Sequence, residues 1–393
     1  MRFTDGKKQV EAEGTKREKL QIVFNETLRL CKENERKIIH DRDLKIWALG
    51  AARRVSFDTF KASKWWIHKF KKINNIGSRK ITKFVTKRYA DDYDVLVANA
   101  TVFVGDIQQI IEERGEDSIF NTDQSGFNLE FHGGRTLTEK GLKTVLAEAQ
   151  SLNSLTHSYT IQPFISVEGQ LMPVLLIVLQ ESGGSFGPRV SKSLFTAPNI
   201  YVVASSSGKL TKDIFQAWVK HVYYPNVPDK STLILDSWTG QSESNVQSVQ
   251  VEGKEIVIKT IPKGTTGLVQ PLDVFGFRIW KNFVRTFYDY VILHDVDFKI
   301  HERNNILRIQ AFVHNQMSSP RFKNMWRYSW YKSGYTLVEP GPFPNPVSYC
   351  FHCEGCTCSE CDDVPVMTCA WCKSCLCLQH LIVNIHLCNK YSE

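Results

Sequence analysis

Cysteine is nearly absent from most of this 393-residue chain. Of its 11 cysteines, Cys31 alone stands outside the last forty-four residues. The N-terminus carries charged residues from Arg2 to Lys8 and lacks the apolar run of a secretory signal. Clustered cysteines without such a signal favour thiolate–metal chemistry in a reducing compartment, with disulfides as the alternative. We therefore expect a nuclear or cytosolic protein.

A long hydrophobic run is also missing. The longest apolar stretch, Leu171–Leu179, is about half of the roughly 20 residues that span a bilayer. It predicts a buried strand, and we expect no membrane partner. Because the composition is 42% hydrophobic and 11% aromatic, the chain can bury a sizeable core. Its length predicts two or three domains.

Acidic residues are missing from one segment near the N-terminus. Residues 1–90 hold 24 Lys+Arg against 10 Asp+Glu, whereas residues 91–393 hold 25 against 31. Between Asp58 and Asp91 there are ten basic residues and no acidic one. This segment suits a polyanion such as double-stranded DNA, and a solvated basic face is the alternative. The candidate DNA-binding residues are Lys61, Lys64, Lys69, Lys71, Lys72, Arg79, Lys80 and Lys83.

Apolar residues at helical spacing follow a polar segment, residues 1–37, to which we assign no function. Leu44, Trp47, Ala48 and Ala51 predict one helix within residues 38–95. Trp66, Phe70 and Ile73 predict another, with Ser63 as its N-cap. A basic segment after Gly77 would complete a helix-turn-helix domain, in which most lysines contact phosphates and Arg79 and Lys80 contact bases.

The pattern changes to short apolar runs from about residue 117, which predicts an α/β domain over residues 96–338. Strands are expected at 118–121, 159–167, 171–179, 200–204, 232–235 and 255–261, and helices at 213–221 and 274–292. Four prolines within residues 339–348 predict a stiff linker to a small Cys/His-rich domain, residues 349–393.

Three aspartates follow apolar runs in this α/β domain, namely Asp123, Asp236 and Asp273. An acid at the end of a strand lies at the rim of a sheet, where hard oxygen ligands can hold the two ions of a phosphoryl-transfer site about 4 Å apart. An aspartate that closes a strand is more often a turn former or a helix cap. The spacing of the three therefore has to be considered together with the residues around them.

The residues around the acids resemble the acidic blocks of pogo-like transposases of the mariner superfamily, which include CENP-B, Tigger and jerky-related proteins. The blocks are Asn121–Phe127, Leu233–Asp236 and Ile261–Asp273, with 36 residues between the last two acids. The resemblance implies a ribonuclease-H-like core in which the three acids hold Mg2+ or Mn2+. It also implies strand cleavage by water, then attack of the freed 3′ hydroxyl on target DNA, by a homodimer that pairs two ends.

The resemblance covers residues 40–393. Residues 61–70 are similar to a CENP-B-type helix-turn-helix, and Phe322–Tyr335 and the Cys/His tail look like the C-terminal part of invertebrate members. After Asp236 the chain continues Ser237-Trp238, where many relatives have an asparagine. We predict a nuclear DNA transposase; a domesticated or inactive CENP-B-like protein, which binds DNA without cutting it, is the alternative.

The tail carries more soft ligands than two zinc ions need. Paired ligands two residues apart let one tight turn present two groups to a tetrahedral ion, which predicts at least two structural Zn2+ sites. A ubiquitin-ligase RING fits the dense spacing poorly. The ligands are expected to be a subset of Cys350, Cys353, Cys356, Cys358, Cys361, Cys369, Cys372, Cys375, Cys377, His380, His386 and Cys388.

Overall fold

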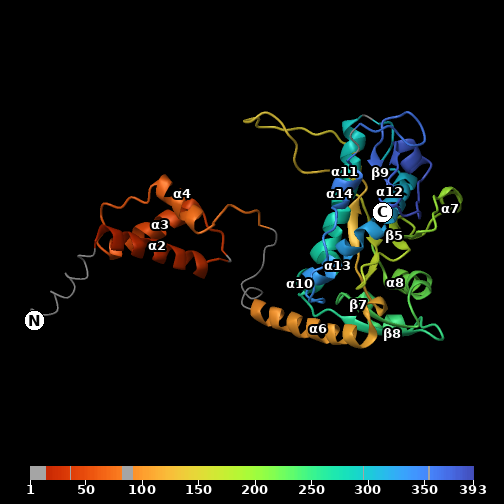
Figure 1. Ribbon diagram of the computed structural model, residues 1–393, viewed down its shortest axis with the longest axis horizontal. Coiled ribbons are helices and arrows are strands. Elements are labelled where there is room, and N and C mark those ends of the chain that lie inside the picture. Colours follow the sequence, from red (N-terminus) through yellow and green to blue (C-terminus); the bar gives the residue numbers. More distant parts are fainter. Residues whose placement is uncertain (1–14, 36, 82–91, 295, 353–354) are drawn as a thin grey trace, which may run out of the picture. The chain divides into compact units, whose positions relative to one another are not determined.

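The computed structural model describes residues 15–35, 37–81, 92–294, 296–352 and 355–393 (Figure 1). The chain divides into two compact units, Met1–Tyr93 and Asp94–Glu393. Each unit is described by itself below.

The N-terminal unit is built from short amphipathic helices. Side chains cap two of them: Thr15 accepts from the backbone N–H of Glu18, and Ser63 accepts from that of Trp66 at 3.2 Å. The rings of Trp66 and Phe70 stack at 5.3 Å between centroids and pack into the helical core. The predicted all-α character of this region is confirmed. Its helices are α2 (Lys16–Glu33), α3 (Asp41–Arg54) and α4 (Lys64–Ile73).

A mixed sheet lies at the centre of the second unit. Strands β1 and β2 pair antiparallel with β4 and β3, and one unbroken register joins the two pairings, since Thr122 faces Phe164 and Ser125 faces Ile161. β1 and β2 therefore form one bent central strand, interrupted at Asp123. The strands are β1 (Ile119–Thr122), β2 (Ser125–Asn128), β3 (Ser158–Gln162), β4 (Phe164–Ser166), β5 (Leu175–Gln180), β6 (Ile200–Ser205), β7 (Lys230–Leu235) and β8 (Glu255–Thr260).

The rest of the sheet extends on both sides of the central strand. On one side β3 pairs antiparallel with β5, and β6 lies parallel to β5. On the other side β7 lies parallel to β1, and β8 lies parallel to β7. Hydrogen bonds group these strands in the orders β4-β1-β7-β8 and β2-β3-β5-β6. The antiparallel strands β2, β3 and β5 thus adjoin the parallel strands β1, β7 and β8 through the central strand, as in a ribonuclease-H-like core, so the predicted fold class is confirmed.

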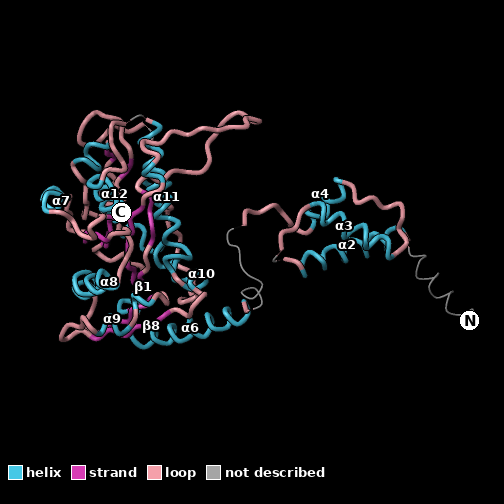
Figure 2. The backbone as a smooth tube through the Cα atoms, turned by 180° about the vertical axis from the view of Figure 1, so that it is seen from behind, coloured by secondary structure: helices cyan, strands magenta, loops and turns pink. Residues whose placement is uncertain are grey.

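Helices cover both faces of this sheet (Figure 2). Leu176 and Val178 of β5 face one apolar cluster with Trp218 of α8, whereas Ile177 faces another with Trp280 of α11. This alternation explains why β5 reads as a continuous apolar run in the sequence. The larger helices are α6 (Tyr93–Arg114), α8 (Lys212–Trp218), α11 (Phe277–Leu293), α12 (Arg303–Met317) and α13 (Lys323–Lys332), and the smaller are α7 (Pro188–Ser193), α9 (Glu243–Gln247), α10 (Thr266–Val269) and α14 (Pro346–Cys350).

Helix α6 has the length and composition of a membrane-crossing segment. Its buried side chains, Ala100, Phe103 and Ile107, join the main core of the second unit, and Gln108 donates a hydrogen bond to the carbonyl of Gly334 at 2.7 Å. The sequence pattern did not predict this helix. Most of the helix is exposed, including the apolar side chains of Val95 and Val102, so only one side of α6 packs on the unit.

A long loop, which contains one short 3-10 helix at Asn153–Leu155, projects from the unit between β2 and β3 (Figure 1). Its base is fixed by Glu130, which is fully buried and accepts hydrogen bonds from the backbone N–H groups of Gln150 and Ser151 at 2.7 and 3.0 Å. His132 bridges Glu130 and Asp289, each at 2.8 Å. These contacts tie the loop to α11.

The Cys/His-rich module packs directly on the α/β core. Asn315 and Gln316 of α12 hydrogen-bond to its backbone, at Cys388 N–H (3.1 Å) and Ala370 N–H (2.6 Å). In the predicted linker, Phe343 packs edge-to-face against Phe275, with centroids 6.2 Å apart. The module therefore belongs to the same compact unit as the sheet. Its regular elements are β9 (Met367–Thr368), β10 (Cys375–Leu376) and η8 (Gln379–Val383).

We predict that Gly169→Ala destabilises the protein by about 3 kcal/mol. Gly169 has φ +93°, and an added Cβ would lie 2.5 Å from the backbone carbonyl oxygen of Lys323 in α13. Gly253 is the matched control, because it has φ +80° and nothing within 4 Å of an added Cβ. Gly253→Ala should cost only the left-handed backbone penalty of about 1 kcal/mol. Urea denaturation of both variants measures the difference, and equal costs would contradict the close packing of this turn on α13.

Candidate functional site

The sheet brings two of the three predicted acids to the same level. β1 and β7 are parallel, with Asn121 opposite Ile234. Two residues further along each strand stand Asp123 and Asp236, so the register places them side by side at the carboxyl ends of neighbouring strands. Asp123 is buried with 6% exposure, and Asp236 is half-buried.

The third acid is positioned by the residues that precede it. Gln270 is fully buried; its amide accepts a hydrogen bond from Asn121 at 3.0 Å and donates one to the carbonyl of Thr122 at 3.1 Å. Pro271, which has no N–H to leave unpaired, starts the turn Leu272–Gly276. Asp273 lies in this turn, within hydrogen-bond reach of Asp123. Gln270 thus binds the central strand through its side-chain amide, and the turn that follows places Asp273 near the end of that strand.

The carboxylates repel one another. Burial raises the pKa of Asp123 well above its usual range, and the negative charges of Asp273 and Asp236 raise it further. Partial burial and the charge of Asp236 raise the pKa of Asp273 as well. The carboxylate of Asp236 accepts hydrogen bonds from the backbone N–H of Ser237 at 2.6 Å and the hydroxyl of Thr266 at 3.1 Å. These two donors fix its direction.

Hard oxygen ligands with excess negative charge are the donor set that Mg2+ or Mn2+ prefers. All three candidate ligands are carboxylates, and burial alone makes the charge on Asp123 costly. A divalent cation would offset that cost. The residues present therefore fit a divalent-metal site at this edge of the sheet.

Sequence reasoning missed one cation beside the acids. Lys281 lies in α11, about two turns after Asp273, and interacts electrostatically with both Asp273 and Asp123. Burial lowers the pKa of Lys281, and the two acids act against that shift. A lysine two turns beyond the third acid was visible in the sequence, but its approach to Asp123 depends on how α11 packs against β2.

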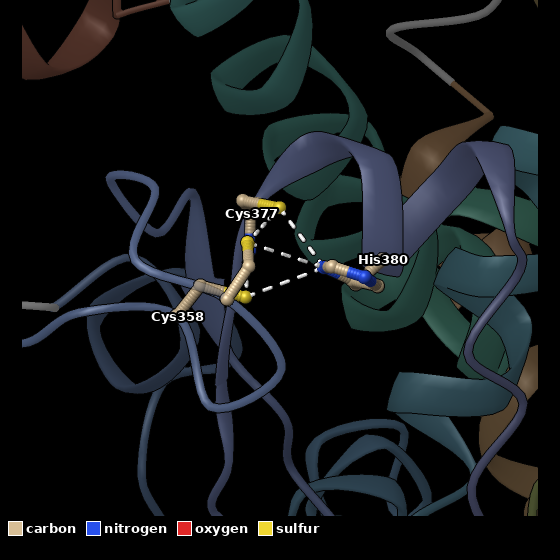
Figure 3. Close-up of side chains that lie close together, drawn as sticks. Cys358, Cys377 and His380 are labelled. Atoms are coloured by element: carbon tan, nitrogen blue, oxygen red, sulfur yellow. Dashed lines mark hydrogen bonds between the residues drawn. The ribbon is translucent and has the colours of Figure 1, made fainter.

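The Cys/His module holds a first group of four metal-ligand atoms, from Cys358, Cys361, Cys377 and His380, which all lie within 4.8 Å of one another. The sulfurs of Cys361 and Cys377 are 3.7 Å apart, and His380 Nδ1 is 3.3 Å from Cys377 Sγ (Figure 3). With Zn–S bonds of about 2.3 Å, the edge of a tetrahedron is about 3.8 Å. The spacing of the sulfurs therefore fits a tetrahedral zinc site.

The ligands of this group are also prepared electrostatically. Burial acts to raise the pKa of Cys358, but backbone N–H groups, of Cys377 and Glu360 foremost, outweigh it and lower this pKa to about 6. A thiol with a lowered pKa is readily deprotonated, and the thiolate is the form that binds metals. Cys361 of the same group is the exception. A hydrogen bond from the backbone acts to lower the pKa of Cys361, but burial and the neighbouring thiols of Cys358 and Cys377 outweigh it and raise this pKa to about 12.

The second group consists of Cys369, Cys372, His386 and Cys388. Burial lowers the pKa of His386, which favours the neutral imidazole that ligates metals. The ligands come in four pairs along the chain. The first group consists of the pairs Cys358/Cys361 and Cys377/His380, and the second consists of Cys369/Cys372 and His386/Cys388. The pairs of the two groups therefore alternate along the chain. Each ion would join two segments that have a ligand pair of the other group between them.

Four of the predicted ligands are not in these groups. Cys350 is buried at the end of α14, Cys356 is exposed, and Cys375 lies on β10. Cys353 falls outside the described residues. The spacing of the sequence could not choose among the twelve candidates, because several pairings satisfy the two-residue rule equally well.

The predicted DNA-binding residues lie mainly on the exposed side of α4 and after it. Lys61, Lys64, Lys69, Lys72, Arg79 and Lys80 are exposed. Lys71 differs, because its amine pairs with Asp41 at 2.7 Å. Trp65 is 68% exposed, with the amine of Lys69 5.0 Å from its ring centroid. Lys83 lies outside the described residues.

Comparison with known proteins agrees with this geometry. Residues 175–326 match the model of the DDE superfamily endonuclease family, a range that contains Asp236 and Asp273 and begins after Asp123. This segment of the second unit is similar to DDE endonuclease domains. Residues 330–388 match the C-terminal domain of Tc5 transposases. The chain is similar to pogo- and mariner-like transposases, as its resemblance predicted.

Individual relatives are more distant. The human Jerky protein homolog is 25% identical over 159 residues, which are 38% of this chain and 27% of that protein. The chain thus spans about a quarter of that relative's length. Among solved structures, the Mos1 transposase paired-end complex with the left transposon end has a TM-score of 0.40 at 8% identity and 80% coverage of both chains. The Mos1 strand transfer complex has a TM-score of 0.39, at 8% identity and coverage of 80% of this chain and 79% of that one.

We predict that Asp123→Asn stabilises the protein at neutral pH in the absence of Mg2+. A buried carboxyl group whose pKa is raised on folding destabilises the folded state progressively as the pH rises above its ordinary pKa, and the loss is complete once the pH exceeds the raised value. Below the ordinary pKa of 3.8 the group is neutral in both states and the substitution gains nothing. The rise in thermal midpoint should therefore be larger at pH 8 than at acidic pH.

Added Mg2+ provides the internal control for this prediction. It should raise the midpoint of the wild-type protein, because it binds the folded carboxylates, and raise that of Asp123→Asn much less. A wild-type protein indifferent to Mg2+, together with a variant that is no more stable at pH 8, would show that the acids do not repel one another as the structure indicates.

Proposed function

We propose that this protein is a DNA-binding transposase that cuts DNA strands with divalent metal ions and joins the freed ends to target DNA. The observation that carries the proposal is the meeting of Asp123, Asp236 and Asp273 at one edge of the sheet, with pKa shifts that record their mutual repulsion. A cluster of like charges costs stability unless a cation binds there. Sites of this kind are typical of function rather than of structure.

Asp123, Asp236 and Asp273 would together hold the metal ions, since Asp123 stands between Asp236 on the neighbouring strand and Asp273 on the following turn. When bound, Mg2+ or Mn2+ activates the attacking oxygen and stabilises the leaving one. The protein's own contribution is to hold the three carboxylates still. Gln270, Thr266 and the Ser237 N–H do this through the hydrogen bonds described above.

Double-stranded DNA would be held in part by the N-terminal unit. The exposed lysines around α4 supply phosphate contacts, which give salt-sensitive affinity with little sequence preference. Such a protein would act in the nucleus, and two copies would be needed to hold two DNA ends together. Lys71 contributes less in this scheme, since Asp41 already neutralises it.

Zinc would be structural, with one ion in each of the two Cys/His groups. The module has too little apolar surface to fold by itself, and two interleaved ions would replace a core. Because Gln316 contacts the second group at Cys369 Sγ (3.6 Å) and Ala370 N–H, zinc would also stabilise the C-terminal end of α12.

The test of the proposed activity is nicking of a supercoiled plasmid in Mg2+ or Mn2+. We expect nicking by the wild-type protein, and loss of at least about 100-fold in rate with Asp236→Asn, since the site then lacks one metal ligand. Asp106→Asn is the matched control, because Asp106 is exposed on α6. Full nicking by Asp236→Asn would refute the assignment. Binding of DNA without nicking by the wild-type protein would support a domesticated, non-cutting function instead.

Zinc content tests the second metal assignment. We expect elemental analysis of Cys372→Ser to show one zinc ion fewer per chain than the wild-type protein, with a lower thermal midpoint of the second unit. Cys31→Ser serves as the control, because Cys31 lies in helix α2 of the other unit. Unchanged zinc content in Cys372→Ser would exclude this residue as a ligand.

A further inference from the structure

Three cations lie in a row on α11, next to the acid cluster. Arg278, Lys281 and Arg285 are spaced by three and four residues, so they share one face of the helix. Arg278 is exposed, and Lys281 and Arg285 are half-buried. From the first to the third, the row covers about 10 Å of the helix axis, which is about three nucleotides of one DNA strand along the duplex axis.

Each of these side chains rests on an aromatic ring. The guanidinium of Arg278 is 5.4 Å from the ring centroid of Phe275, the amine of Lys281 is 5.6 Å from that of Phe127, and the guanidinium of Arg285 is 4.6 Å from that of Phe131. The rings hold the long side chains against the protein. Their charged ends are therefore positioned in advance, which lowers the entropy cost of binding a ligand.

The charges of the row are not consumed by the protein. Among the residues that the structure describes, none of the three forms an ion pair within 4.0 Å of a carboxylate. Asp289, the next acid on this side of α11, pairs with His132 instead, at 2.8 Å. Arg285 donates only to the amide oxygen of Asn282, at 2.8 Å. The row is therefore available to an anion.

The middle of the row lies near the acids that would hold the metal ions. Lys281 interacts with Asp273 and Asp123 through charge but is not in contact with either as an ion pair. A phosphate bound by the ions would lie between the acids and this amine. Partial burial and repulsion from Arg285 both disfavour the positive charge on Lys281. A phosphate bound beside this amine would stabilise that charge.

We propose that Arg278, Lys281 and Arg285 form a track that holds one DNA strand by its phosphates, with Lys281 on the phosphate next to the bond that is cut. The proposal rests on the proposed function, because it takes DNA as the ligand of the acid site. Arg278 and Arg285 bind the neighbouring phosphates, and the track sets the direction in which the strand crosses the acids. Lys281 is a positioning residue and forms no covalent bond.

The test uses the full chain and two measurements. Single-turnover nicking of a supercoiled plasmid in Mg2+ reports the cut, and anisotropy of a short fluorescein-labelled duplex over a range of salt, with Ca2+ in place of Mg2+, reports phosphate contacts. We expect Lys281→Met to slow nicking on the order of 10- to 100-fold and to reduce the slope of log K against log salt by about 0.9. Lys281→Arg should retain most of the rate, since it keeps the charge.

Controls separate a charge effect from a loss of structure. Lys192→Met, in exposed α7, removes a lysine away from α11 and should change neither measurement. Arg285→Met should reduce the salt slope by about the same amount as Lys281→Met and slow nicking less. Thermal midpoints and zinc contents should equal those of the wild-type protein in every variant.

The outcomes distinguish this proposal from the proposed function. A wild-type protein that neither binds nor nicks DNA would overturn both. Nicking and binding by the wild-type protein, with Lys281→Met and Arg285→Met indistinguishable from it in rate and salt slope, would overturn the track alone. Loss of nicking in Lys281→Arg as well as Lys281→Met, with the salt slope unchanged, would also overturn it, since the lysine would then matter for packing only.

Discussion

Electrostatic repulsion among three carboxylates at one edge of the sheet is the constraint around which the second unit is organised. Asp123 interrupts the central strand, Asp236 ends the strand beside it, and Asp273 follows in a turn. Like charges would move apart in a flexible chain. They stay together because a fully buried glutamine, Gln270, binds the end of β1 and because α11 packs along its length against the sheet.

The same constraint accounts for the cations near the site. A single lysine, Lys281, approaches the acids without pairing with them. A closer ion pair would neutralise the cluster and weaken its hold on metal ions, whereas a cation farther away would not influence a phosphate there. Aromatic rings under Lys281 and its neighbours on α11 keep these charges in place.

The C-terminal module extends the rigid part of the molecule. Its two Cys/His groups interleave along the chain, so each links distant segments of a region with few large apolar side chains. Hydrogen bonds from Asn315 and Gln316 then join the module to α12, which belongs to the endonuclease domain. The soft Cys/His ligands and the three carboxylates thus form separate groups within one unit.

Sequence alone determined the kinds of residue and their order: the α/β class, the strand ends that carry Asp123 and Asp236, the block that carries Asp273, the helical N-terminal unit with Trp66 and Phe70 in its core, and the soft ligands gathered in the tail. Periodicity and motif spacing report such local properties directly. Tertiary structure decided which eight of twelve candidate ligands form groups, that α6 and α12 exist, that Lys71 is paired, and that Lys281 faces the acids. Those facts depend on contacts between segments far apart in the chain, which no local pattern encodes.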